Sequence, residues 1–207
     1  MKPADLCDKI KLWGLDAGRA ETSVDMANTK PPLPNFAEPP VFETVLGVEF
    51  PSLEGWAVPH FGLFWEQIRS DYPQFEVHPP LAAVNDLRSK EDRIFQAVMV
   101  EFLPHPPIRC WYLDANKTRL LQVQTDRFIY NWRKTESSAA YLRYDNIRPI
   151  FEREWNRYVE FLTAEKLDVP VPERCEVTYV NHLLKGKEWN SLADLTRVIP
   201  AWAGCAS

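Results

Sequence analysis

Several signatures of common protein classes are absent from this sequence, and each absence narrows what the chain can be. Glycine occurs only 7 times in 207 residues, which is too few for a nucleotide-binding protein built on glycine-rich loops. No uninterrupted apolar run reaches the roughly 18 residues of a membrane span. The first 25 residues mix acidic and basic side chains without the apolar core of a secretory signal, so we expect a cytoplasmic protein that does not contact a membrane.

The cysteines form no recognisable metal or redox motif. Cys7, Cys110, Cys175 and Cys205 lie far apart, without a C-x-x-C pair and without histidines at metal-ligand spacing. This spacing excludes zinc ribbons and thioredoxin-type motifs, and it favours reduced thiols in a cytosolic protein. The P-loop, Rossmann, H-E-x-x-H and G-x-S-x-G signatures are also absent. We therefore expect neither a metal nor a cofactor.

Proline and aromatic residues are abundant. The chain has 18 prolines among its 207 residues, compared with about 5% in an average protein. Aromatic residues make up 13% of the sequence and include 8 tryptophans, which predicts an aromatic-rich core. The net charge of −5 gives no global attraction to nucleic acid, although a local basic patch remains compatible with it.

Hydrophobic periodicity predicts an α+β domain. Alternation predicts strands at residues 41–50, 94–103, 109–114, 120–134 and 175–184, and helical spacing predicts amphipathic helices at 59–72 and 145–162 with a short helix at 191–198. Asp145 is the expected cap of the second helix, and residues 74–92 read as irregular. This order indicates an antiparallel sheet of about five strands with two amphipathic helices packed on one face.

The long strand predicted at 120–134 has an irregular hydrophobic pattern. Its hydrophobic residues up to Val123 share one parity, whereas those from Phe128 onward have the opposite parity. Either both faces of the strand are partly covered, or a β-bulge near Asp126 and Arg127 resets the register. We favour the bulge.

The strongest candidate binding site lies on this same strand. Its members are basic, aromatic and amide side chains: Arg127, Tyr130, Asn131, Trp132, Arg133 and Lys134. Three cations beside two aromatic rings would suit a phosphate clamp or a base-stacking surface. A sheet with buried aromatic residues and solvated basic residues explains the same pattern, and we consider it the more common origin.

A second candidate site comprises Glu176, Asn181 and His182. If Asn131 and Asn181 lie on neighbouring strands, their amides would serve a shared polar site. A histidine near a carboxylate is suited to acid–base catalysis because its pKa lies near neutrality. No serine or cysteine nucleophile is recognisable nearby, so a structural role for the histidine is favoured.

Four ordered motifs resemble a known family. They are L-P-x-F-x-x-P-P-V at 33–41 with L-G-V-x-F at 46–50, H-F-G-L-F-W at 60–65, Q-x-Q-x-D-R-F-x-Y-N-W-R-K at 122–134, and E-x-T-Y-V-N-H at 176–182. Together they resemble a sporadically distributed bacterial family of unknown function, over residues 33–202. The resemblance implies no activity, cofactor or catalytic residue.

The resemblance also bears on the two ends of the chain. Members of the family usually begin shortly before the first motif and continue past a stretch similar to 200–202. The comparison implies that residues 1–32 form a flexible N-terminal extension, with Met26 as an alternative start. It further implies that residues 33–207 form a single α+β domain shortened at its C-terminal end. A genuinely shorter family member is the alternative.

These observations lead to three ranked hypotheses for function. The first is a non-enzymatic cytoplasmic binding or protein-interaction component with a protein partner or a homo-oligomeric state, because catalytic signatures are absent and a shortened sheet would expose an edge. The second is a nucleic-acid-binding or nucleic-acid-processing protein that uses strand 127–134, which we do not favour. The third is a small-molecule enzyme that uses His182.

Overall fold

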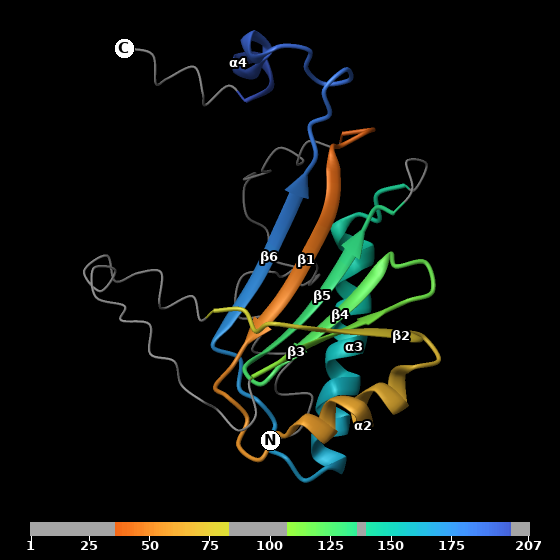
Figure 1. The fold of residues 1–207 in the computed structure, drawn as a ribbon, viewed down its shortest axis with the longest axis vertical. Coiled ribbons are helices and arrows are strands. Elements are labelled where there is room, and N and C mark those ends of the chain that lie inside the picture. The colour runs from red at the N-terminus through yellow and green to blue at the C-terminus, as the bar shows by residue number, and fades with distance from the viewer. Residues whose placement is uncertain (1–35, 83–106, 136–139, 200–207) are drawn as a thin grey trace, which may run out of the picture. The chain divides into compact units, whose positions relative to one another are not determined.

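The computed structural model describes residues 36–82, 107–135 and 140–199 (Figure 1). The chain divides into two units, residues 1–39 and 40–207, and every helix and strand described here belongs to the second. In chain order the elements are β1 (Val41–Glu49), α2 (Val58–Ile68), β2 (Gln74–His78), β3 (Arg109–Leu113), β4 (Arg119–Gln124), β5 (Arg127–Arg133), α3 (Tyr144–Ala164), β6 (Arg174–Asn181), the 3₁₀ helix η3 (Leu192–Asp194) and α4 (Leu195–Val198).

The strands of the described residues form one antiparallel sheet in the order β2-β3-β4-β5-β1-β6. The first strand in sequence therefore lies inside the sheet, between β5 and β6 (Figure 1). The predicted α+β class with an antiparallel sheet is confirmed. The sheet has six strands rather than about five.

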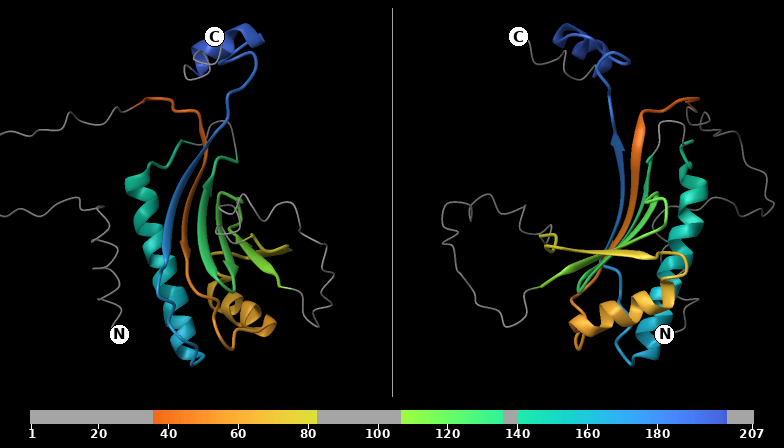
Figure 2. Two further views of the ribbon diagram at one scale, coloured as in Figure 1. Left: turned by 90° about the vertical axis from the view of Figure 1, so that its left-hand side faces the viewer. Right: turned by 45° about the vertical axis from the view of Figure 1, so that its right-hand side comes forward.

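Two amphipathic helices cover the same face of the sheet, as predicted. Trp155 and Tyr158 of α3 pack against the Phe128 ring of β5 at centroid distances of 5.6 and 5.0 Å. Phe64 of α2 meets the Tyr112 ring of β3 at 5.7 Å, and the strand register places Phe128 and Tyr112 on one face. Figure 2 shows α3 running along this face. We call it the helix face, and it contains the aromatic core.

Residues 120–134 form the β4–β5 hairpin, so the prediction of one bulged strand is wrong. Thr125 and Asp126 make the turn, and neither residue has a positive φ. Because this turn needs no residue with positive φ, the sequence does not contain the Asn-Gly or Asp-Gly pair that marks most two-residue hairpins. The backbone N–H groups of Phe50 and Leu53 donate to the carbonyls of Asp126 and Thr125, each at 2.9 Å. The change of parity in the hydrophobic pattern therefore marks a reversal of the chain. Hydrogen bonds from the segment after β1 stabilise this turn.

Other sequence predictions differ from the structure in detail. The stretch 74–92 begins with strand β2, which was missed because it has only five residues, of which the first four are exposed. The strand predicted at 94–103 lies outside the described residues. Asp145 is in the first turn of α3 rather than at its cap, which is Arg143. The short helix predicted at 191–198 is present as η3 and α4.

Candidate functional site

The face of the sheet opposite the helices is polar, and we call it the polar face. Cross-strand pairing places one residue of each strand in a row on this face: Glu76, Trp111, Gln122, Ile129, Gly47 and Glu176. Side chains at every second position along each strand share the face because strand side chains alternate. These include Arg109, Arg127 and Arg133, so the polar face is rich in arginine.

A chain of side-chain hydrogen bonds crosses four strands of the polar face. Arg109 Nη1 donates to Gln122 Oε1 at 2.9 Å, and Gln122 Nε2 donates to Asn131 Oδ1 at 2.8 Å. Asn131 Nδ2 in turn donates to Glu43 Oε1 at 2.7 Å. Gln122 and Asn131 are both buried, so each amide needs these partners. The two amides thereby connect the guanidinium of β3 to the carboxylate of β1.

The indole of Trp111 is the centre of a group of cationic and aromatic side chains. The guanidinium carbons of Arg109 and Arg133 lie 5.4 and 5.8 Å from the centroid of its ring, within the range of a cation–π contact. The His78 ring lies 4.0 Å from the same indole, and its Nε2 is 3.0 Å from a carboxylate oxygen of Glu76. We call Trp111, Arg109, Arg133 and His78 the Trp111 cluster.

The arginines of the polar face differ in how their charge is neutralised. Glu49 lies between two of them, 2.7 Å from Arg174 and 3.5 Å from Arg127. Arg109 and Arg133 have no carboxylate partner among the residues that the structure describes. Burial, together with the like charge of Arg127, lowers the pKa of Arg109 from its ordinary value. Arg109 and Arg133 therefore form no close ion pair within the described residues, although Glu43 is the cross-strand neighbour of Arg133 and Glu76 bonds to His78 of the Trp111 cluster.

The predicted basic-aromatic strand divides between the two faces of the sheet. Its aromatic members, Tyr130 and Trp132, are buried on the helix face. Its other members on β5 face the opposite way: Arg127, Asn131 and Arg133. The cations of this strand consequently do not lie beside its own aromatic rings. The ring next to Arg133 is Trp111, which comes from β3 and was absent from the predicted site.

Two further residues of the predicted sites lie apart from this group. Lys134 follows β5, and its backbone N–H donates to the carbonyl of Phe42 at 2.8 Å. Asn181 is on β6, whereas Asn131 is on β5, and β1 lies between these strands. The two asparagine amides are thus not on neighbouring strands, which removes the shared polar site that depended on that arrangement.

Glu176 and His182 are both exposed and are not brought together as an acid–base pair. Glu176 accepts a hydrogen bond from Thr178 Oγ1 at 2.6 Å on the polar face. His182 follows β6, and its ring stacks on Phe42 with centroids 3.8 Å apart and planes 12° from parallel. The histidine therefore packs on a hydrocarbon ring at the end of the sheet.

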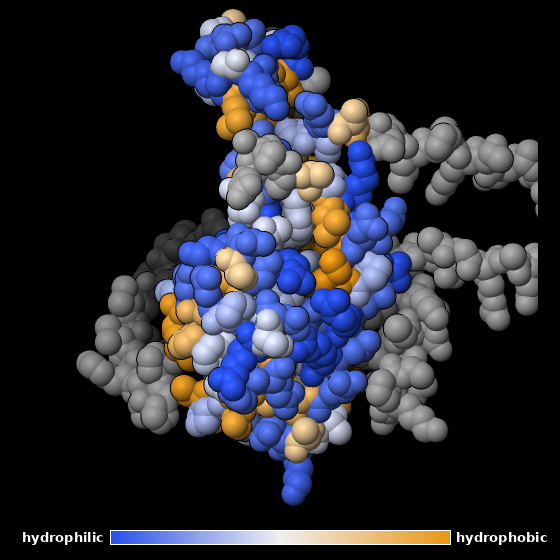
Figure 3. All heavy atoms as spheres, turned by 90° about the vertical axis from the view of Figure 1, so that its right-hand side faces the viewer, coloured by the Kyte–Doolittle hydropathy of each residue, from blue (hydrophilic) through white to orange (hydrophobic). Residues whose placement is uncertain are grey.

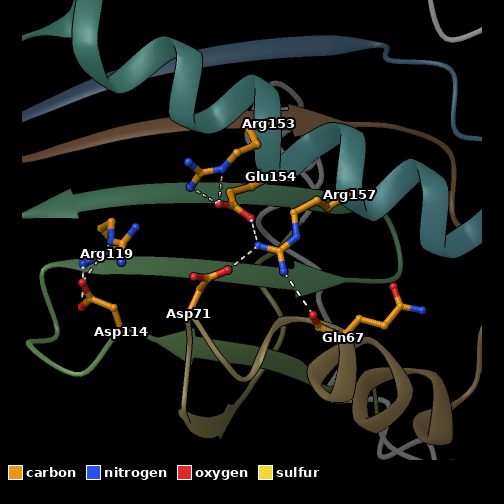
Figure 4. Close-up of polar contacts among 7 residues, drawn as sticks. All are labelled: Gln67, Asp71, Asp114, Arg119, Arg153, Glu154 and Arg157. Carbon is orange, nitrogen blue, oxygen red and sulfur yellow. Dashed lines mark hydrogen bonds and ion pairs between the residues drawn. The ribbon is translucent and has the colours of Figure 1, made fainter.

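A buried carboxylate on the helix face escaped the sequence analysis (Figure 4). Glu154 of α3 is fully buried and lies 2.5 Å from Arg153 and 3.1 Å from Arg157. Arg157 also donates to Asp71 at 2.8 Å and to the Gln67 carbonyl at 3.1 Å, so this network joins α3 to the end of α2. A signal existed, because Glu154 falls on the apolar stripe of its helix.

Two tyrosines next to this network have buried hydroxyls. Tyr72 OH and Tyr130 OH have no hydrogen-bond partner among the described residues. Burial, with a further contribution from the Glu154 carboxylate, raises the pKa of both phenols well above the usual range. Arg119 lies over the Tyr72 ring at 5.6 Å and pairs with Asp114 at 3.1 Å. Both phenols stay protonated at neutral pH, and the network itself joins α3 to the end of α2.

Comparisons with known proteins give no indication of function, so the function is argued from the geometry of the polar face and the sheet edge. Within the described ranges, no three His, Cys, Asp or Glu side chains gather closely enough to hold a metal ion. No helix of the described part of the chain is both long and apolar enough to cross a membrane. The chain matches no protein-family model, no curated protein and no solved structure. The family resemblance seen in the sequence stays a prediction.

Proposed function

We propose that this chain is a cytoplasmic, non-enzymatic interaction protein that pairs with a second copy of itself through β6. The observation that carries the proposal is the open edge of this strand, which ends the sheet of the described residues. On the helix face this edge presents Val177 and Tyr179, which are 43% and 46% exposed. An edge strand with exposed apolar side chains is a template for the addition of another strand.

The sequence of β6 is complementary to itself in antiparallel pairing. When two copies pair about Thr178, Val177 of one copy lies opposite Tyr179 of the other. Glu176 then lies opposite Val180, and the two Thr178 residues face each other, so no like charges meet. Such apolar and threonine pairs stabilise neighbouring strands, and a two-fold symmetric interface uses the same patch on both copies. These properties favour a second copy over an unrelated partner.

The two described thiols are poorly suited to act as nucleophiles, because burial raises the pKa of both. Cys110 and Cys175 are both free, the first buried and the second exposed. Burial raises the pKa of Cys110 to about 11, so this thiol is a poor nucleophile at neutral pH.

A different face of the molecule offers less to a partner than the β6 edge does. The face in Figure 3 is mostly hydrophilic, and hydrophobic residues form only small groups on it. This distribution supports the choice of the sheet edge as the contact.

Light scattering of the full chain tests the proposal. We expect the solution mass of two chains for the unmodified protein. The substitutions V177K and Y179K should each give the mass of one chain, because each places a lysine against its counterpart's apolar side chain. V77K is the matched control, since Val77 is exposed at 56% on the opposite edge strand, β2. A monomeric unmodified protein, or a dimer that only V77K disrupts, would refute pairing through β6.

A further inference from the structure

The Trp111 cluster contains several buried donors without acceptors. Arg109 Nε, Arg133 Nε and Trp111 Nε1 are all buried and have no hydrogen-bond partner within the described part of the chain. Buried N–H groups in folded proteins nearly always have an acceptor, because leaving one unpaired is costly. Three such donors around one indole ring indicate that an acceptor group belongs there.

The electrostatics of the cluster favour an anionic acceptor. Within the described residues, both guanidiniums donate hydrogen bonds to neutral oxygens: Arg109 donates to Gln122 Oε1 at 2.9 Å, and Arg133 donates to the Lys117 carbonyl at 3.2 Å. The like charge of Arg127 also acts on Arg109. A bound anion would give both guanidiniums the close ion pair that the described residues do not form with them.

Two guanidiniums from different strands lie against the same indole, at 5.4 Å for Arg109 and 5.8 Å for Arg133. Arg109 leans toward β4, where it bonds to Gln122. Arg133 comes from β5, which lies beyond β4 as seen from Trp111. The His78 ring, from β2 on the other side of β3 in the sheet, is tilted by 33° against the indole. An anion bound at the indole would therefore lie close to both arginines.

We propose that the Trp111 cluster binds the phosphate group of a small phosphorylated compound between Arg109 and Arg133. Phosphate offers several acceptor oxygens in a geometry that suits guanidinium forks, and three unpaired donors exceed what one carboxylate edge satisfies. The hydrogen bonds of Gln122 to Arg109 and Asn131 hold one arginine in place. The polar face is then a small-molecule site, distinct from the β6 edge.

Calorimetric titration of the full chain with inorganic phosphate and with pyrophosphate tests this site. We expect saturable binding at low salt. R109Q and R133Q should each weaken binding by about tenfold, the effect of losing one charge-assisted hydrogen bond. W111F keeps an aromatic ring but removes Nε1–H, so its affinity should fall by a smaller factor. R69Q should leave the affinity unchanged, because Arg69 is an exposed residue of α2 paired with Glu66.

Several outcomes would overturn the site. These are no saturable binding of either phosphate or pyrophosphate, or an equal loss of affinity in R69Q. Binding of a single-stranded oligonucleotide without binding of pyrophosphate would overturn it in favour of a nucleic-acid surface. Thermal unfolding of each variant identifies any that fails to fold. If an arginine variant does not fold, the affinity of W111F decides the test. The mass measurements on β6 variants are separate, so either proposal can fail alone.

Discussion

The two faces of the sheet are made by the same strands but are built on different interactions. On the helix face, Phe128 of β5 packs against aromatic rings of α3. On the polar face, Asn131 of the same strand bonds to Gln122 and Glu43 of the two neighbouring strands. Burial of apolar area stabilises the first face, whereas satisfied amide and charged groups order the second. One strand can therefore serve the core and a polar surface at once.

Each face also contains a carboxylate between two arginines. On the helix face the carboxylate is the most buried member of this group, whereas on the polar face an arginine is. Glu154 is fully buried on the helix face, while the side chains of Arg153 and Arg157 are 54% and 27% exposed. On the polar face the more buried partner is a cation, since Arg127 is only 7% exposed and Glu49 is 14% exposed. The polar face is consequently more than a solvated surface, and removing Glu49 leaves the buried Arg127 with Asp126, at 3.7 Å, as its remaining carboxylate.

The largest loss of stability should come from alkaline pH, which ionises tyrosines buried on the helix face. Burial raises the pKa of Tyr72, Tyr112, Tyr130 and Tyr158 in the folded protein. Unfolded tyrosine ionises near pH 10, so the stability these phenols support is complete below about pH 10 and is lost as the pH rises above it. Tyrosinate absorbance should appear together with loss of circular dichroism. Ionisation of most tyrosines in a still folded protein would contradict this.

The next largest effect should come from truncating one β5 residue on each face of the sheet, which compares how much each face contributes to stability. F128A should lower the free energy of unfolding by about 3–5 kcal/mol, because it removes a buried ring from the aromatic core. R133A should lower it by about 1 kcal/mol or less, the value of one ordinary hydrogen bond. Urea unfolding measures both, and equal losses would show that the two faces support the fold equally.

Neutralising Glu49 and Glu154 should reverse the order of the two faces, with the larger loss of stability on the polar face. E49Q should cost about 2–4 kcal/mol because buried Arg127 loses its main counter-charge. E154Q should cost about 1–2 kcal/mol, since Arg153 and Arg157 reach solvent and the amide still accepts hydrogen bonds. Unfolding in urea at neutral pH measures the difference. A larger loss in E154Q would mean that burial of the carboxylate itself decides the cost.

The smallest effect should come from the β6 end of the polar face. E176Q removes the charge of an exposed side chain that accepts a hydrogen bond from the Thr178 hydroxyl. We expect a change within about 0.5 kcal/mol, as for most surface substitutions. A loss above 1 kcal/mol in chemical unfolding would extend the ordered polar network to β6.

The fold was largely predictable because its periodicities are strong. The alternation of 41–50 and the helical stripe of 145–162 correspond to β1 and α3. The β4–β5 hairpin was missed because its turn at Thr125 and Asp126 uses ordinary φ values and has no glycine. Its carbonyls are satisfied by Phe50 and Leu53, and such long-range bonds leave no local pattern.

The candidate site was less predictable because it is assembled across strands. Arg133 and Asn131 were singled out from one strand, but their neighbours Trp111, Gln122 and Glu43 come from three others. Reading one strand at a time grouped Arg133 with Trp132, which alternation places on the opposite face. Only the strand order and register show which aromatic ring lies beside which cation.

The turn of the β4–β5 hairpin has a consequence for the order of folding. Because Phe50 and Leu53 supply the donors for both turn carbonyls, the hairpin completes its hydrogen bonds only when the segment after β1 has arrived. β1 pairs with β5 across more than 70 residues of sequence, and such distant pairings slow folding. The final hydrogen bonds of the hairpin turn and the docking of the segment after β1 should thus form in the same step of folding.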